Sequence, residues 1–86
     1  MVKSIEFKLD NNEYGWKDYS AVVENTTSQD FDSFYLNIKF VDADGITVDT
    51  TTASADDWKS GEKVKFTFMT DAKFEEIQWD YEYYNN

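Results

Sequence analysis

Three aspartates around a short turn are the residues whose type and spacing best suit metal binding. Asp42, Asp44 and Asp49 flank Gly45, and carboxylate oxygens are ligands that Ca²⁺ prefers. An EF-hand loop needs a third acid before its glycine and a glutamate six residues after it, where this chain has Thr51. The ligand set is incomplete. We therefore expect these aspartates to cap backbone amides of a hairpin turn, with no metal ion and no cofactor bound.

Paired carboxylates are the second arrangement that could do chemistry. Asp80 and Glu82 stand two residues apart, and a glycosidase uses two carboxylates roughly 5–10 Å apart across a cleft. The pair falls on the polar side of an alternating stretch, so a solvated strand face is the favoured interpretation. The chain also has no His and no Cys, which removes the commonest general base, the Ser–His–Asp triad and thiolate chemistry. The sequence predicts a protein that is not an enzyme.

Aromatic residues make up 19% of the chain, and some of them are available to contact a ligand. Trp79, Tyr81 and Tyr83 share the parity of Ile77 along one stretch and are expected to face a core. The aromatics left over are candidates for binding a protein or a glycan, because exposed loop aromatics often make contacts: Tyr14, Trp16, Tyr35 and Tyr84. For Trp16 a second interpretation stays open, that it is a lid packed over the end of the core.

The charge of the chain is strongly one-sided, with 8 basic and 18 acidic residues and a net charge of −10. Phosphate backbones would be repelled, so we expect no binding to nucleic acid. No apolar run approaches the ~18 residues of a membrane span, so we expect no membrane insertion by this domain. The triplet Asn25-Thr26-Thr27 matches a glycosylation sequon, which arises often by chance.

Hydrophobic residues alternate with polar ones almost throughout, which is the signal of β-strands with one buried face. We predict a single all-β domain over residues 1–86, an antiparallel two-sheet sandwich of immunoglobulin-like type with about six to seven strands. The strands are expected at 5–10, 19–24, 34–41, 46–49, 63–68 and 77–84. Between them we expect a polar loop at 10–15, a crossing at 52–61 in which 54–57 could form a helical turn, and a turn at 70–72 that closes the last hairpin. The predicted core residues are Phe7, Leu36, Ile38, Phe40, Phe66, Phe68 and Trp79.

The middle of the chain resembles the FxLYD-type family of bacterial immunoglobulin-like domains, over roughly residues 19–68. In that family a strand ends in Val-x-Asn, a second strand leads into an Asp-x-x-Gly hairpin, and a Pro-Gly-Glu-like corner opens a strand of alternating aromatics. Val41 stands where the family has Tyr, and Ser60 where it usually has Pro. The matching stretches are Val23-Glu24-Asn25-Thr26-Thr27, Phe40-Val41-Asp42-Ala43-Asp44-Gly45, Ile46-Thr47-Val48, Ser60-Gly61-Glu62, and then Val64, Phe66 and Phe68.

The resemblance implies a non-catalytic module of a bacterial surface or secreted protein, located outside the cell or at its surface. Such a module acts as a spacer or binds another protein. The alternative is a carbohydrate-binding module that stacks sugar rings on its exposed aromatics. In either case the expected partner is a protein or a glycan.

Overall fold

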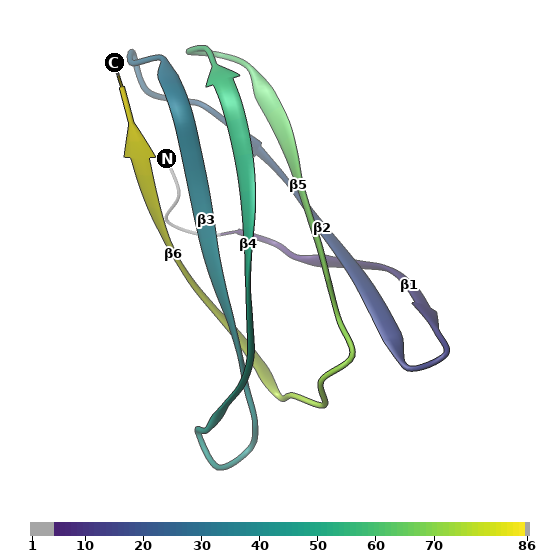
Figure 1. The fold of residues 1–86 in the computed structure, drawn as a ribbon. Coiled ribbons are helices and arrows are strands. Elements are labelled where there is room, and N and C mark those ends of the chain that lie inside the picture. The colour runs from purple at the N-terminus through teal and green to yellow at the C-terminus, as the bar shows by residue number, and fades with distance from the viewer. Residues whose placement is uncertain (1–4, 86) are drawn as a thin grey trace.

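Two three-stranded antiparallel sheets make up the computed structural model, which describes residues 5–85 (Figure 1). Their strand orders are β1–β2–β5 and β4–β3–β6. The predicted all-β, two-sheet sandwich is thereby confirmed, while residues 1–4 and 86 of the predicted domain lie outside the described residues. The strands are β1 (Lys8–Glu13), β2 (Trp16–Glu24), β3 (Phe31–Val41), β4 (Thr47–Trp58), β5 (Lys63–Thr70) and β6 (Glu76–Tyr84).

The central strand β3 shows why the alternation predicts the fold. Phe34, Leu36, Ile38 and Phe40 are all buried, while the residues between them face outward. A strand with one dry face and one wet face specifies its register, because a slip of one residue would turn every apolar side chain to solvent. β6 pairs with β3 over nine successive residue pairs, among which Ile77 lies opposite Phe40.

The core lies between the two sheets and is rich in aromatic rings. Of the predicted core residues, Leu36, Ile38, Phe40, Phe66 and Phe68 are buried, which confirms them. Phe7 and Trp79 are partly buried and pack against this cluster. The prediction missed three large core rings. These are Phe31, which was assigned to a polar loop, Phe34, and Trp58, which was assigned to a crossing; all three are buried.

Two predicted connections are wrong, because both are strands. The 10–15 loop is mostly β1, which ends at Glu13 and is exposed along its whole length. With both faces in solvent, it shows no apolar alternation to reveal it. The 52–61 crossing is largely β4, whose inward positions hold the small residues Ala53 and Ala55, and no helical turn forms at 54–57. Pairing with β3 along nearly the whole strand outweighs the weak strand propensity of its Ser, Ala and Asp residues.

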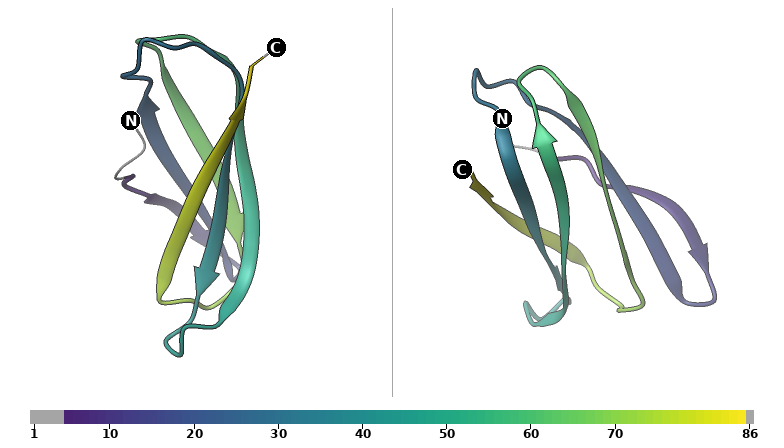
Figure 2. Two further views of the ribbon diagram at one scale, coloured as in Figure 1. Left: turned by 90° about the vertical axis from the view of Figure 1, so that its left-hand side faces the viewer. Right: turned by 45° about the horizontal axis from the view of Figure 1, so that its top comes forward.

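The sandwich is closed along one side and open along the other. The segment after Thr70 does not close a hairpin, because β5 and β6 belong to different sheets, and this prediction was also wrong. On the closed side β4 and β5 approach within 8 Å between Cα atoms. Among the described residues, β6 comes that close to β3 and to no other strand. Figures 1 and 2 show β6 as the outermost strand of its sheet on the open side.

Candidate functional site

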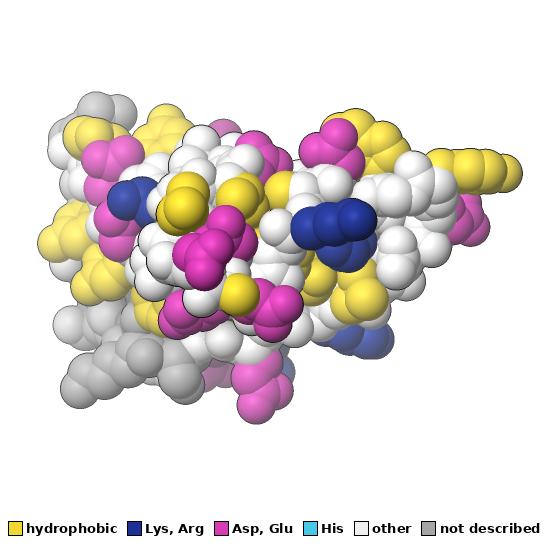
Figure 3. All heavy atoms as spheres, turned by 90° about the horizontal axis from the view of Figure 1, so that it is seen from below, with side chains coloured by type: hydrophobic (Ala, Val, Ile, Leu, Met, Phe, Trp, Pro, Cys, Tyr) yellow, Lys and Arg dark blue, Asp and Glu magenta, His cyan; other side chains and the backbone are white. Residues whose placement is uncertain are grey.

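The β1–β2 hairpin forms an arm that extends away from the β4–β3–β6 sheet (Figure 2). Glu13 pairs with Trp16, which leaves Tyr14 and Gly15 as a two-residue turn. Both turn residues have positive φ, 55° for Tyr14 and 83° for Gly15, as a type I′ hairpin turn requires. In Figure 3 the arm ends in a hydrophobic side chain that stands clear of the surface.

The tip of the arm carries two of the predicted contact residues. Tyr14 is 99% exposed and Trp16 is 48% exposed, so Trp16 is not the buried lid of the core that the sequence left open. Asn, Asp and Gly are the residues that adopt left-handed φ readily. A tyrosine there costs of order 1 kcal/mol, and a fully exposed ring recovers none of that through packing. The tip therefore holds a tyrosine at a position where Asn or Gly would make the turn more stable.

The other two predicted contact residues lie at the opposite end of the molecule. Tyr35 and Tyr84 form an edge-to-face pair on the outer face of the β4–β3–β6 sheet, with ring centroids 5.8 Å apart and planes at 70°. The Tyr84 hydroxyl donates a hydrogen bond to Glu82 Oε2 at 3.0 Å, which raises the pKa of Tyr84. The structure does not bring the four aromatics together, and the Tyr35–Tyr84 pair offers no flat surface for a sugar ring.

Two of the three aspartates considered for calcium, Asp42 and Asp49, accept hydrogen bonds from backbone amides. Asp42 Oδ1 accepts hydrogen bonds from the amides of Asp44 and Ile46, both at 2.9 Å. Asp49 accepts from the Thr50 amide at 2.9 Å and, through its second oxygen, from the Thr70 hydroxyl at 2.7 Å. Over residues 5–85, no three acidic side chains gather in a way that could hold a metal ion.

The paired carboxylates of β6 lie on its outer face. Asp80 pairs in register with Asn37, and Glu82 with Tyr35. A shallow depression of about 340 Å³ on this face is lined in part by Asp80 but not by Glu82. The two groups therefore do not face each other across a common cleft, as the two carboxylates of a glycosidase do.

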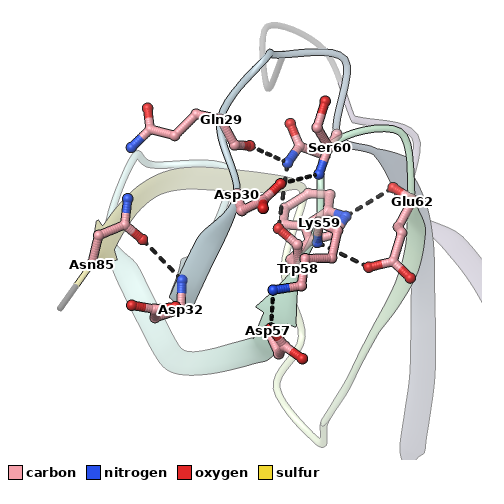
Figure 4. A network of polar contacts seen from close by, with 10 residues as sticks. Gln29, Asp30, Asp32, Asp57, Trp58, Lys59, Ser60, Glu62 and Asn85 are labelled. Carbon is pink, nitrogen blue, oxygen red and sulfur yellow. Dashed lines mark hydrogen bonds and ion pairs between the residues drawn. The ribbon is translucent and has the colours of Figure 1, made fainter.

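A polar network fastens one end of the sandwich, and part of it is drawn in Figure 4. Asn25 is fully buried. Its Nδ2 donates to the carbonyls of Gln29 at 2.8 Å and Trp58 at 3.4 Å, and its Oδ1 accepts from the Thr27 amide at 3.1 Å and hydroxyl at 2.6 Å. The sequon asparagine is thus a structural residue whose amide is not available for a glycan.

The same network joins two stretches that carried the family resemblance. The backbone N–H of Asn25 donates to the Glu62 carbonyl at 2.9 Å, and the backbone N–H of Gly61 donates to the backbone carbonyl of Asn25 at 2.8 Å. The indole of Trp58 donates to the Glu62 carbonyl at 2.8 Å, and the Ser60 hydroxyl donates to the Thr27 carbonyl. These motif residues hold a corner of the fold together, so the motif is evidence about the fold and gives no information about binding.

Sequence reasoning missed two surface features. One is a groove of about 550 Å³ between the arm and the neighbouring edge strands, lined by Tyr19, Thr51, Thr52, Phe68 and Met69 among others. The other is on β6, where Tyr81 and Tyr83 are on the inward-facing side as predicted but remain 48% and 45% exposed. Parity along a strand gives the face on which a side chain lies, but not whether another strand covers that face.

No family model, curated protein or solved structure matches this chain. Within residues 5–85 the structure contains no helix of sufficient length and apolarity to cross a lipid bilayer.

Proposed function

We propose that this chain is a non-catalytic, immunoglobulin-like module of a bacterial surface or secreted protein, and that it binds another protein through the tip of its β1–β2 arm. The observation that carries this proposal is Tyr14. It is fully exposed and adopts a φ of 55°, where Asn or Gly would be more stable. Residues held in such conformations cluster at functional sites, and Tyr and Trp are enriched among the residues that dominate protein interfaces.

The placement of the arm supports the same function. Its tip bears Tyr14 and Trp16, and all of β1 is exposed, so a partner can reach the tip and both faces of β1. The net charge of −10 favours partners with a basic surface and disfavours nucleic acid. The carbohydrate-binding alternative has less support, because Tyr35 and Tyr84 belong to the sheet that does not contain the arm and their rings stand edge to face.

Changing Tyr14 to Asn separates binding from stability. Asn-Gly is the preferred pair for a type I′ turn, so we expect Y14N to raise the free energy of unfolding by about 0.5–1 kcal/mol, measured by urea denaturation. The labelled domain is then applied to a panel of purified extracellular proteins and to a glycan array. We expect binding to a protein that Y14N and W16A each weaken at least about tenfold, as hot-spot residues do.

The matched control is Y35A, which removes an aromatic ring at the other end of the molecule and should leave that binding unchanged. A glycan signal that W16A abolishes would favour the carbohydrate-binding module. Absence of any protein binder, together with a Y14N variant no more stable than the parent, would contradict the proposal and leave a spacer.

A further inference from the structure

Over residues 5–85, the outer edge of β6 pairs with no other strand. β6 pairs with β3 along one edge only, and no other described strand approaches it within 8 Å between Cα atoms. Figures 1 and 2 show β6 as the outermost strand of its sheet. Such an edge is a template on which an additional extended chain can pair.

The aromatic side chains of β6 leave part of the core wall uncovered beside this edge. Tyr81 stacks on the buried Phe34, with ring centroids 5.5 Å apart and planes at 10°. Tyr83 packs on the buried Phe31 at 4.8 Å. The inner rings are dry, yet nearly half of each tyrosine stays in contact with solvent. A further strand beside β6 would place its own inward side chains against these rings.

The features that usually protect a strand edge are missing from β6. Edge strands are commonly blocked by a β-bulge, by Lys or by Pro. β1, the neighbouring edge on the open side, has a bulge between Leu9 and Asn11. β5, an edge strand on the closed side, carries Lys63 and Lys65. β6 has no bulge, no Lys and no Pro, and its nine residue pairs with β3 run without a register shift. Its charged residues, Glu76, Asp80 and Glu82, are all acidic, so they repel an acidic strand and leave the edge open to a basic one.

The charge of β6 defines the chemistry of what would pair with it. Residues 74–86 contain four acids and no basic residue. Asp80 and Glu82 lie on the outer face, where the one lysine across the sheet is Lys39, opposite Gln78. A second copy of the chain is a poor occupant, because each copy carries −10 and two β6 strands side by side would bring like charges together.

We propose that the free edge of β6 accepts an extended basic segment of a partner protein as a seventh strand. The inward side chains of that segment are apolar and cover Tyr81 and Tyr83, and its outward side chains are Lys or Arg that pair with Asp80 and Glu82. The backbone hydrogen bonds supply affinity, and the alternation of side chains supplies specificity. This site goes beyond the arm described above and lies on another side of the molecule (Figure 1).

The test uses a fluorescently labelled nine-residue peptide, Lys-Val-Lys-Phe-Lys-Val-Lys-Phe-Lys, matched to the length of β6. Binding to the intact chain is followed by fluorescence anisotropy. The D80K/E82K double variant is expected to bind about tenfold more weakly. The control D10K/E13K makes the same change of charge on β1 and is expected to stay within about twofold. Equal weakening by both variants would show charge attraction without a site and would overturn the proposal.

Two further peptides test backbone pairing and alternation. A peptide of the same composition with all lysines first keeps the charge but loses the alternation, and should bind at least about tenfold more weakly. Backbone N-methylation at every even position, or separately at every odd position, blocks one strand edge at a time. We expect one of these two peptides to bind and the other not.

Equal binding of both methylated peptides, or a dimer of the free chain that D80K/E82K dissociates in sedimentation, would overturn the proposal. The Y14N variant separates this result from the function of the arm, because it should bind the peptide unchanged whether or not the arm binds a protein.

Discussion

Replacing Trp58 by alanine is expected to lower the free energy of unfolding by about 3–5 kcal/mol, the range for deleting a buried aromatic side chain. Trp58 is buried and packs against Phe34 at 5.0 Å and Phe66 at 5.8 Å between ring centroids. Its indole N–H also donates to the Glu62 carbonyl. The substitution therefore opens a cavity among rings and removes one of the two donors to that carbonyl, which keeps its hydrogen bond from the Asn25 backbone N–H. Domains of this size commonly have only about 5–15 kcal/mol of stability.

The measurement is urea denaturation followed by circular dichroism, since guanidinium salt would screen the repulsion within a chain of net charge −10. W16A is the matched control, because it deletes the same side chain at a half-exposed position and should cost well under about 1 kcal/mol. W58F keeps much of the ring and isolates the loss of the N–H donor, at about 1–2 kcal/mol. Equal losses for W58A and W16A would contradict the placement of Trp58 in the core.

The second large effect is expected from Asn25→Asp, which changes one atom in the buried network. The side-chain amide of Asn25 donates two hydrogen bonds, to the backbone carbonyls of Gln29 and Trp58. A carboxylate would turn an oxygen toward those carbonyls in a fully buried position. We expect a loss of about 3–5 kcal/mol at pH 7, as for an uncompensated buried charge.

This loss should depend on pH in a defined direction. Burial and the two carbonyls that face the second oxygen outweigh the two donors of Thr27 and raise the pKa of the new carboxyl in the folded state above its unfolded value of about 3.9. The penalty relative to the parent chain is therefore smallest near the unfolded pKa. It grows as pH rises, by up to about 1.4 kcal/mol per pH unit, until the folded pKa is passed. Urea denaturation of both chains at several values between pH 5 and pH 8 measures the difference.

Asn12→Asp is the control, because it adds the same charge on the exposed strand β1 and should change stability by less than about 0.5 kcal/mol. If N12D were as destabilising as N25D, net charge would explain the effect and the network would not.

How far the sequence predicts each strand depends on whether one face of that strand is buried and the other is exposed to solvent. β3 and β5 each have one dry face, and there the alternation gave the strand and the buried residues. β1 has no dry face, and the alternation predicted a strand at 5–10 that covers only its first half, Lys8 to Asp10. On β4 the parity set by Ala53 and Ala55 would turn Asp57 inward, but Asp57 adopts a φ of 51° and Trp58 is buried instead. A local backbone feature of this kind has no signature in residue type.

The candidate sites divide in the same way. Tyr14 and Trp16 were candidates for contact because no strand parity accounted for them, and for Trp16 a core lid was the other interpretation. The structure exposes Tyr14 fully and Trp16 by about half, which excludes the lid. The left-handed turn at Tyr14 was not predictable, because tyrosine is rarely found in that conformation. For Tyr81 and Tyr83 the parity predicted the correct face of β6. Their exposure depends on the absence of a neighbouring strand, which is a property of the whole topology.

The uneven distribution of buried contacts along the 38 Å length of the molecule has a consequence for its motions. Opening the corner around Asn25 would expose the indole of Trp58, so we expect its amides to exchange with solvent only when the whole domain unfolds. The outer part of the arm, which is β1 and the tip at Tyr14, is exposed, and we expect it to fray on its own at a small fraction of the global free energy. A partner that docks at Tyr14 would order the mobile tip of the arm. The loss of conformational entropy on binding would then be confined to the arm, and the core would not change.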